Sequence, residues 1–340
     1  MRERYLHQIL FEEIGEEGQE RISRGNVCIA GCGALGSMSA MVLVRAGAGK
    51  VRIIDRDFVE MKNLHRQILY DEADASNIMP KAIVAAEKLR KINSSVQIEG
   101  IVADLNHLTA EELLGGCDVI VDGSDNFETR FLINECAVKH SIPWIYGAAR
   151  GSYGITFNII PGEGPCLRCI FESAPQQGSY EACDTSGIIP SVPYIVASIQ
   201  CVEVLKILSG RKQKLNSFIS AIDVWKGVSN QMRLGSKRAD CPVCVLHEFK
   251  MLEQCEFSSG IGRCGRNVVQ IQPLKQRARI DLESLRKKSE GALDIVYNGF
   301  LLRIKLAEHE ITVFPDGRAF VKGTEDADLA RSLYERYVGG

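Results

Sequence analysis

The feature that most constrains the fold is a glycine-rich turn between an apolar strand and an apolar helix. Residues 26–30 form a short apolar run, and a helix of small and apolar residues ends near residue 46. Between them stand three glycines, Gly31, Gly33 and Gly36. Glycine here permits a tight turn and lets a phosphate approach the free backbone N–H groups of a helix N-terminus. The turn therefore predicts a nucleotide-binding βαβ unit.

Strand and helix patterns alternate from residue 26 to residue 147. This alternation predicts βαβ units, which wind right-handed into a parallel sheet. After residue 150 the apolar residues alternate as in antiparallel strands, and a strong helix is predicted over 195–208. The predicted fold class is therefore α/β: a Rossmann-like, mostly parallel sheet that antiparallel strands continue, plus a small C-terminal α+β domain.

A break in the pattern sets off the C-terminal part. Residues 250–266 show no clear period, and residues 315–317 (Pro-Asp-Gly) are a hairpin turn signal between two apolar runs. We expect a main domain over residues 1–247, a linker over 248–266 and a small domain over 267–340.

Charge and composition exclude several classes of protein. The 340 residues include 41 Lys and Arg against 43 Asp and Glu, a formal net charge of -2. This balance argues against nucleic-acid and membrane-surface partners. No apolar run approaches the roughly 20 residues that cross a bilayer, and residues 1–4 carry no targeting pattern. We therefore expect a cytoplasmic protein.

Asp55 stands at the end of the second predicted strand, where a carboxylate can bond a ribose hydroxyl. With the glycine turn alone, this is typical of an NAD enzyme. The segment that follows, from Asp57 to Gln67, favours a nucleoside triphosphate instead. Arg66 can contact phosphate oxygens in a bidentate manner, and Lys81 can add a point charge at the start of the next predicted helix.

A second acidic segment follows another predicted strand. It extends from Asp122 to Asn126 and includes Asp125. Carboxylates at the carboxyl end of a strand suit Mg²⁺, which shares its coordination with phosphates. Arg66, Lys81 and Asp125 together therefore predict a site for a nucleotide with magnesium.

Four of the twelve cysteines stand in two Cys-x-x-Cys pairs. The pairs are Cys166 with Cys169 and Cys241 with Cys244. Two such pairs predict a tetrahedral zinc site even when they are far apart in sequence, because folding can bring them together. Four thiolates leave no open ligand position, so the predicted role is structural. Two redox dithiols are the alternative.

These motifs, in this order, resemble the MoeB/ThiF/HesA family, the bacterial and archaeal relatives of the ubiquitin-activating enzymes. The resemblance covers residues 1 to about 247 with compatible spacing. It rests on the glycine turn, the run from Asp55 to Gln67, Pro80-Lys81-Ala82, the run from Asp122 to Arg130 and both cysteine pairs.

The resemblance implies a reaction. Members of the family use MgATP to adenylate the C-terminal glycine carboxylate of a small ubiquitin-like sulfur carrier that ends in Gly-Gly. Pyrophosphate leaves as an acyl-adenylate forms. The implied pathways are thiamine or molybdopterin synthesis or another sulfur transfer. Since a carboxylate is already a nucleophile, this chemistry needs charge neutralisation and in-line positioning rather than a general base.

Roles for individual residues also follow from the resemblance. The residues implied in nucleotide binding are Gly31, Gly33, Gly36, Asp55, Asp57, Asn63, Gln67 and Asn126. Arg66 and Lys81 hold the phosphates together with Asn63, and Asp125 places Mg²⁺. Cys183 stands in a Gly-, Pro-, Ser- and Gln-rich stretch. It either joins covalently to the activated carrier or is a bystander thiol.

The N-terminus departs from the family pattern. Relatives carry Arg-Tyr-x-Arg-Gln, whose second arginine reaches the ATP of the partner in a homodimer. Residues 4–8 of this chain are Arg-Tyr-Leu-His-Gln, so His7 takes that position. Histidine is shorter and often neutral at pH 7. Either His7 serves, or Arg4 substitutes, or the role is lost; the homodimer itself is implied by the resemblance alone.

Two features leave alternatives open. The chain ends in Gly339-Gly340, like a sulfur carrier, but this tail follows a predicted helix where the tail of a carrier follows a strand. We therefore expect a docking or dimer-supporting domain rather than a fused substrate. The alternatives to a sulfur-carrier adenylyltransferase are activation of another carboxylate (a peptide or a tRNA modification), a non-catalytic scaffold that binds a ubiquitin-like protein, and an NAD oxidoreductase.

Overall fold

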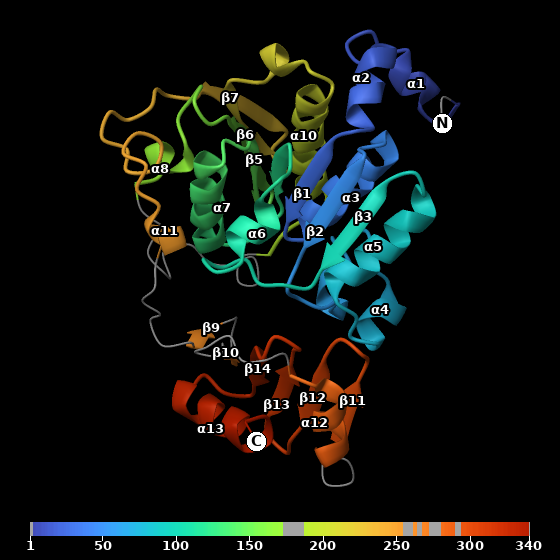
Figure 1. The fold of residues 1–340 in the computed structure, drawn as a ribbon, viewed down its shortest axis with the longest axis vertical. Coiled ribbons are helices and arrows are strands. Elements are labelled where there is room, and N and C mark those ends of the chain that lie inside the picture. The colour runs from blue at the N-terminus through green and yellow to red at the C-terminus, as the bar shows by residue number, and fades with distance from the viewer. Residues whose placement is uncertain are drawn as a thin grey trace. The chain divides into compact units, whose positions relative to one another are not determined.

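The computed structural model describes residues 3–172, 187–253, 261–263, 267–271, 280–289 and 294–339. The chain divides into two compact units, Met1–Gln254 (the large unit) and Cys255–Gly340 (the small unit). Each unit has its own sheet, as Figure 1 shows.

An eight-stranded sheet lies at the centre of the large unit, in the order β3-β2-β1-β4-β5-β6-β7-β8. Strands β3, β2, β1, β4 and β5 pair in parallel, and β5 to β8 pair antiparallel. The predicted Rossmann-like sheet with an antiparallel continuation is thus confirmed. The bounds are β1 Asn26–Ala30, β2 Lys50–Ile54, β3 Gln97–Ile101, β4 Val119–Asp122, β5 Trp144–Arg150, β6 Tyr153–Ile159, β7 Phe218–Asp223 and β8 Val228–Arg233.

Helices cover both faces of this sheet. Residues of α3, α5 and α10 form one core cluster with β1 and β2, and residues of α6 and α7 form a second with β4 and β5. Because both faces are buried at the centre of the sheet, β1 and β4 are mostly apolar, whereas the edge strand β3 is only partly buried and carries polar residues. The helices are α1 Leu6–Ile9, α2 Gly15–Ile22, α3 Ala34–Ala46, α4 Glu72–Ser76, α5 Lys81–Ile92, α6 Ala110–Leu114, α7 Phe127–Lys139, α8 Leu167–Ile170, α10 Ser191–Leu208 and α11 Lys250–Glu253. Short 3₁₀ turns span Glu3–Tyr5, Met61–Asn63 (η2) and Lys212–Lys214.

Helix α10 is the one described helix that is long and apolar enough to cross a membrane by length and composition. It packs against α3, β5 and β6, and Val204 and Gln200 on it are fully buried. Its apolar character is therefore accounted for by its place in the core of the large unit.

The direction in which successive strands are added to the sheet reverses between the parallel strands β1 and β4. These two strands are neighbours, with Ala30 paired to Asp122, yet β2 and β3 lie on one side of them and β5 on the other. In open α/β sheets, a change of this kind between neighbouring strands marks the topological switch point. In α/β proteins, ligands bind at this point of the sheet.

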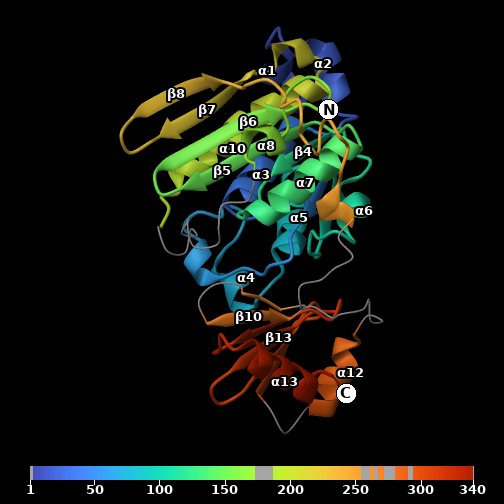
Figure 2. The same cartoon turned by 90° about the vertical axis from the view of Figure 1, so that its left-hand side faces the viewer.

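Strands β7 and β8 form a hairpin that projects from the rest of the large unit (Figure 2). All six residues of β8 are exposed, and Trp225 between the two strands is 80% exposed. Because neither face of β8 is buried, its sequence lacks the apolar alternation by which a strand is recognised.

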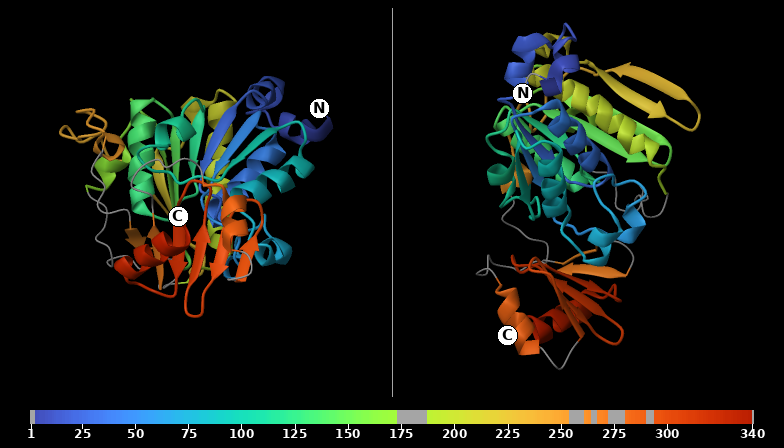
Figure 3. Two further views of the ribbon diagram at one scale, coloured as in Figure 1. Left: turned by 60° about the horizontal axis from the view of Figure 1, so that its bottom comes forward. Right: turned by 90° about the vertical axis from the view of Figure 1, so that its right-hand side faces the viewer.

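The small unit has a six-stranded sheet in the order β11-β12-β13-β14-β10-β9, antiparallel throughout. Its two helices contribute to one core cluster with the apolar strand residues, on one side of the sheet (Figure 3). The bounds are β9 Ile261–Arg263, β10 Val268–Ile271, α12 Leu282–Ser289, β11 Asp294–Tyr297, β12 Leu302–Lys305, β13 Glu310–Val313, β14 Ala319–Lys322 and α13 Ala327–Tyr337. Helix α13 directly precedes Val338 and Gly339.

Candidate functional site

The glycine turn touches the loop that follows β4. A Cβ atom added to Gly31 would lie 2.7 Å from the carbonyl oxygen of Gly123, and one added to Gly123 would lie 2.3 Å from the carbonyl oxygen of Gly31. At Gly36 an added Cβ would lie 1.9 Å from that same Gly31 oxygen. Side chains are thus excluded at all three positions, and the start of α3 is held against the carboxyl end of β4.

Gly33 differs from these three glycines because its surroundings are open. The nearest atom to an added Cβ is Nε2 of Gln67, at 3.8 Å. Gln67 is 4% exposed, and its Oε1 atom is buried without a hydrogen-bond partner among the described residues. A buried amide oxygen without a partner is costly, so it points to a ligand group as the missing partner.

Asp55 is buried and holds two backbone groups. Its Oδ2 accepts a hydrogen bond from the N–H of Cys32 at 2.6 Å, and its Oδ1 accepts one from the N–H of Asp57 at 2.7 Å. Burial raises the pKa of Asp55, while the positive charge of Lys81 acts in the opposite direction. The carboxylate therefore orders the glycine turn itself.

Lys81 is the first residue of α5 and is 5% exposed. Its Nζ lies 3.1 Å from Oδ2 of Asp57, and its backbone N–H donates to the Asp57 carbonyl at 2.9 Å. Burial lowers the pKa of Lys81, but the carboxylates of Asp57 and Asp55 outweigh it, so the net pKa lies above its usual value. Lys81 is therefore a buried, fixed positive charge.

Asn63 is the last residue of η2, and Arg66 follows that turn. Arg66 is half-buried and its Nη1 donates to the Lys62 carbonyl at 3.3 Å. Within the described parts of the chain, Arg66 forms no ion pair with a carboxylate. The side chain of Asn63 is buried and donates to Glu60 at 3.2 Å. The guanidinium of Arg66 thus retains most of its hydrogen-bonding capacity for an anion.

Asp122, the last residue of β4, is fully buried and engaged within the protein. Its Oδ1 accepts from the backbone N–H and the Oγ of Ser124, at 2.9 and 2.6 Å. Its Oδ2 accepts from Nε of Arg130 at 3.0 Å, and Arg130 also donates to the carbonyls of Ser124 and Gly147. Asp122 and Arg130 therefore fix the conformation of the loop after β4 by hydrogen bonds from the buried side.

Asp125 is the exposed carboxylate of that loop. Its negative charge is among the causes that raise the pKa of Lys81, after those of Asp57 and Asp55. The next residue, Asn126, is the N-cap of α7: its side chain accepts a hydrogen bond from the N–H of Thr129 at 2.8 Å. Of the two aspartates, Asp125 is the one whose oxygens are available to a cation.

The structure thus brings eleven of the sequence-predicted residues to the carboxyl ends of β1, β2 and β4 and the start of α5. They are Gly31, Gly33, Gly36, Asp55, Asp57, Asn63, Arg66, Gln67, Lys81, Asp125 and Asn126. Cys183 lies outside the described residues, and so does Gly340 of the C-terminal tail.

The N-terminal helix is fixed to its own chain next to His7. The Tyr5 ring lies against Gly47, where an added Cβ would be 2.5 Å from it, and its hydroxyl accepts from Asn93 at 2.8 Å. Nη1 of Arg4 donates to the carbonyl of Ile92 at 2.9 Å. Arg4 is thus engaged within its own chain, whereas the neighbouring His7 is exposed.

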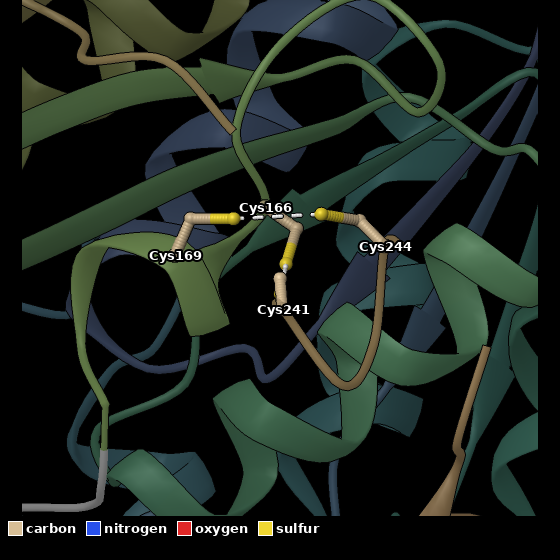
Figure 4. A group of neighbouring side chains, drawn as sticks. All are labelled: Cys166, Cys169, Cys241 and Cys244. Atoms are coloured by element: carbon tan, nitrogen blue, oxygen red, sulfur yellow. Dashed lines mark hydrogen bonds between the residues drawn. The ribbon is translucent and has the colours of Figure 1, made fainter. Parts of the chain in front are cut away.

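The four paired cysteines form one group (Figure 4). Their sulfur atoms all lie within 4.8 Å of one another, with 3.6 Å between Cys166 and Cys241 and 3.4 Å between Cys169 and Cys244. Four sulfurs around Zn²⁺ lie about 3.8 Å apart, given Zn–S bonds of about 2.3 Å. The donor set and its spacing therefore fit tetrahedral zinc.

Three side chains at the site have roles that sequence reasoning missed. Arg130 belongs to a motif that the sequence displays, but only the structure shows its pairing with Asp122. Gln200 of α10 donates to the carbonyls of Asp122 and Ile145, both at 3.0 Å, where β4 and β5 diverge. Tyr70 donates to the glycine turn. A polar residue inside an apolar helix is the one sequence signal that could have indicated Gln200.

The fold and site define the class: an α/β protein with a candidate nucleotide site at the carboxyl ends of its parallel strands and a separate four-cysteine group. The sequence profile of the ThiF family matches residues 5–243. The chain belongs to the ThiF family, as its motifs predicted.

Known relatives agree with this assignment. The chain is 40% identical over 338 residues to the sulfur carrier protein ThiS adenylyltransferase of Bacillus subtilis, which covers 99% of both chains. It is 36% identical to the sulfur carrier protein adenylyltransferase of Thermus thermophilus, over 71% of this chain and 90% of that one. Likeness to the first relative therefore extends through the small unit.

Among solved structures, MccB of E. coli with ATP has a similar fold. The TM-score is 0.62 at 21% identity, over 71% of this chain and 74% of MccB. At this level of identity the likeness concerns the fold alone.

Proposed function

We propose that the protein is an ATP-dependent adenylyltransferase that activates the C-terminal glycine carboxylate of a ubiquitin-like sulfur carrier. An acyl-adenylate would form on the carrier and pyrophosphate would leave. The observation that carries the proposal is the full-length likeness to a ThiS adenylyltransferase. The ion pair of Lys81 with Asp57, the charge of Asp125 acting on Lys81, and the positions of Asp55 and Gln67 beside the glycine turn support it.

The proposed roles follow from charge and position. Backbone N–H groups at the start of α3 and the open space at Gly33 would receive phosphate oxygens. Asp55 would bond the ribose, with Gln67 and Asn126 as further contacts. Lys81 keeps its charge in a buried setting, so it can stabilise charge that develops during phosphoryl transfer.

Arg66 and Asn63 would hold the remaining phosphate oxygens, and Asp125, with Asp57 nearby, would hold Mg²⁺. When bound, the metal would neutralise phosphate charge and align the α-phosphate with the attacking carboxylate. None of the roles requires a general base, because the carrier carboxylate is ionised at neutral pH.

We also propose that the four cysteines hold structural zinc. As thiolates they would occupy all four positions of the metal. Two alternatives stand for Cys183. Either its thiolate attacks the adenylate, so that the carrier acyl group is transferred to sulfur and AMP is released, or Cys183 is a bystander thiol.

A homodimer in which His7 acts on the partner's nucleotide is the proposed assembly. Because Arg4 is bonded to Ile92 of its own chain, His7 is the better candidate of the two. The small unit is proposed as a docking or dimer-supporting domain. We place the enzyme in the cytoplasm, where thiols stay reduced and can bind metal.

The proposal is tested by ATP–pyrophosphate exchange with purified protein, alone and with sulfur carriers that end in Gly-Gly. We expect exchange that depends on the carrier and is lost when the last glycine of the carrier is removed. ATP binding without exchange with any carrier would contradict the proposal. Exchange in the absence of a carrier would indicate the Gly339-Gly340 tail as the substrate instead.

A further inference from the structure

Tyr70 lies between η2 and α4, and its side chain reaches the glycine turn. The residue is 7% exposed and belongs to the core cluster under α3 and α5. Its hydroxyl lies 2.8 Å from the carbonyl oxygen of Cys32 and 3.3 Å from that of Lys81. One phenol group therefore bridges the glycine turn and the first residue of α5.

At the glycine turn, the hydrogen bond from Tyr70 fixes Cys32 together with a second bond, to Asp55. The N–H of Cys32 donates to Asp55 at 2.6 Å, and its carbonyl accepts from Tyr70. Both backbone groups of the residue between Gly31 and Gly33 are thus engaged on the protein side. A phosphate would then meet the turn at Gly33 and at the N–H groups at the start of α3.

At α5, the same hydroxyl meets the residue that carries the buried positive charge. The backbone N–H and the Nζ of Lys81 are both bonded to Asp57, at 2.9 and 3.1 Å. Asp57 and Tyr70 therefore hold Lys81 from two directions. Tyr70 reaches the glycine turn directly at Cys32, whereas Asp57 reaches it through Asp55, whose carboxylate accepts from the N–H groups of Asp57 and Cys32.

We propose that Tyr70 is a positioning residue, which sets the distance between the phosphate-binding turn at Gly33 and the ammonium group of Lys81. This inference rests on the proposed function, because the distance matters where one triphosphate must meet both groups. Transfer of the adenylyl group is sensitive to such spacing, since a displacement of about 1 Å costs up to 10²-fold in rate. Burial raises the pKa of Tyr70, so its hydroxyl remains a donor across the physiological range.

The test is Tyr70→Phe, which keeps the ring in the core and removes only the hydroxyl. A matched control is Tyr334→Phe in the small unit, where a buried hydroxyl donates to the carbonyl of Gly317, also at 2.8 Å. Tyr70→Phe removes the hydrogen bonds to Cys32 and Lys81, and Tyr334→Phe removes the one to Gly317, so small decreases in the thermal midpoint are expected for both variants. Dissociation constants for ATP and adenosine, and kcat and KM for exchange, are measured for both.

For Tyr70→Phe we expect ATP binding and the kcat of exchange to fall about tenfold each. Adenosine, which has no phosphates, should bind within about twofold of the unmodified protein, and Tyr334→Phe should change none of these values. Unchanged ATP affinity and kcat in Tyr70→Phe would overturn the proposal. An equal loss of adenosine and ATP affinity would also overturn it, because it would indicate general loosening of the site.

The two proposals fail in different ways. If the unmodified protein shows no exchange with any carrier, the adenylyltransferase proposal fails, yet the comparison of ATP with adenosine binding still tests Tyr70. If exchange is normal and Tyr70→Phe behaves as the unmodified protein, only the positioning role fails.

Discussion

A buried ion pair beneath the loop after β4 is the residue-scale feature on which the nucleotide site depends. Asp122 is fully buried and Arg130 is 5% exposed. Their carboxylate–guanidinium bond is accompanied by hydrogen bonds to Ser124 and Gly147, so few of their polar atoms lack partners. Asp125 can remain exposed because Asp122 and Arg130 hold the loop that carries it.

We expect Arg130→Met to lower the free energy of unfolding of the large unit by about 3–5 kcal/mol, because Asp122 would be left buried and unpaired. The double variant with Asp122→Asn should lose less than Arg130→Met alone. Denaturation is followed by the fluorescence of Trp144, which is fully buried in β5. The control is Arg24→Met, which removes an exposed pair with Glu20 and should cost less than about 1 kcal/mol. Equal costs for the two arginines would contradict this role.

Replacing Asp125 should impair catalysis and leave the stability of the fold unchanged. Asp125→Ala is expected to reduce ATP–pyrophosphate exchange by at least about 100-fold, because the carboxylate proposed to hold Mg²⁺ is removed. Its exposure means that the thermal midpoint should hardly change. Asp328→Ala, which removes an exposed carboxylate in the first turn of α13, serves as the control. Exchange at the normal rate in Asp125→Ala would refute the role.

At the scale of elements, the four-cysteine group joins two segments that are far apart in sequence. Cys166 directly precedes α8, and Cys169 lies in that helix, beside α7. Cys241 and Cys244 come after β8. A metal here would tie the chain after β6 to the chain after β8, across the antiparallel half of the sheet. This explains why the group is separate from the nucleotide site.

Elemental analysis should find about one zinc per chain in the unmodified protein. Cys241→Ser should lose most of it, and acid should release it, since zinc binds the deprotonated thiolates. Cys201→Ser is the matched control: Cys201 is buried in α10 with its thiol 3.6 Å from the Ser39 carbonyl, away from the group. A metal-free protein that is folded and active would refute the zinc proposal.

For the whole molecule, a homodimer with His7 acting in trans makes a complementation prediction. His7→Ala and Asp125→Ala should each be impaired, for different reasons. Mixed after dissociation, they should form heterodimers with one intact site and recover about one quarter of the normal exchange. No recovery, or normal activity of His7→Ala alone, would contradict action in trans.

The sheet of the large unit could be predicted because its signals are local. The central strands are buried apolar runs followed by polar or glycine residues, as in the chain around Gly31 and Asp55. Strand β8 could not be predicted in this way, since all of its residues are exposed and no alternation marks it. Likewise β11 begins with exposed Asp294 and is only half-buried.

The parts of the site predicted from sequence were those with a motif. Gly31, Lys81 and Asp125 follow strands or begin a helix, so position along the chain indicates position at the sheet edge. Tyr70 carries no such mark, because its hydroxyl acts on backbone groups of residues distant in sequence. Contacts of this kind are fixed by the tertiary structure and leave no periodic pattern.

The most direct test of the account follows the α-phosphate of ATP. In a single turnover with ATP labelled at that phosphate and a Gly-Gly carrier, the account predicts label on the carrier C-terminus and release of unlabelled pyrophosphate. The label should be removed by hydroxylamine, as expected of an acyl-adenylate. Formation of labelled ADP with free phosphate, and no label on the carrier, would contradict the central claim.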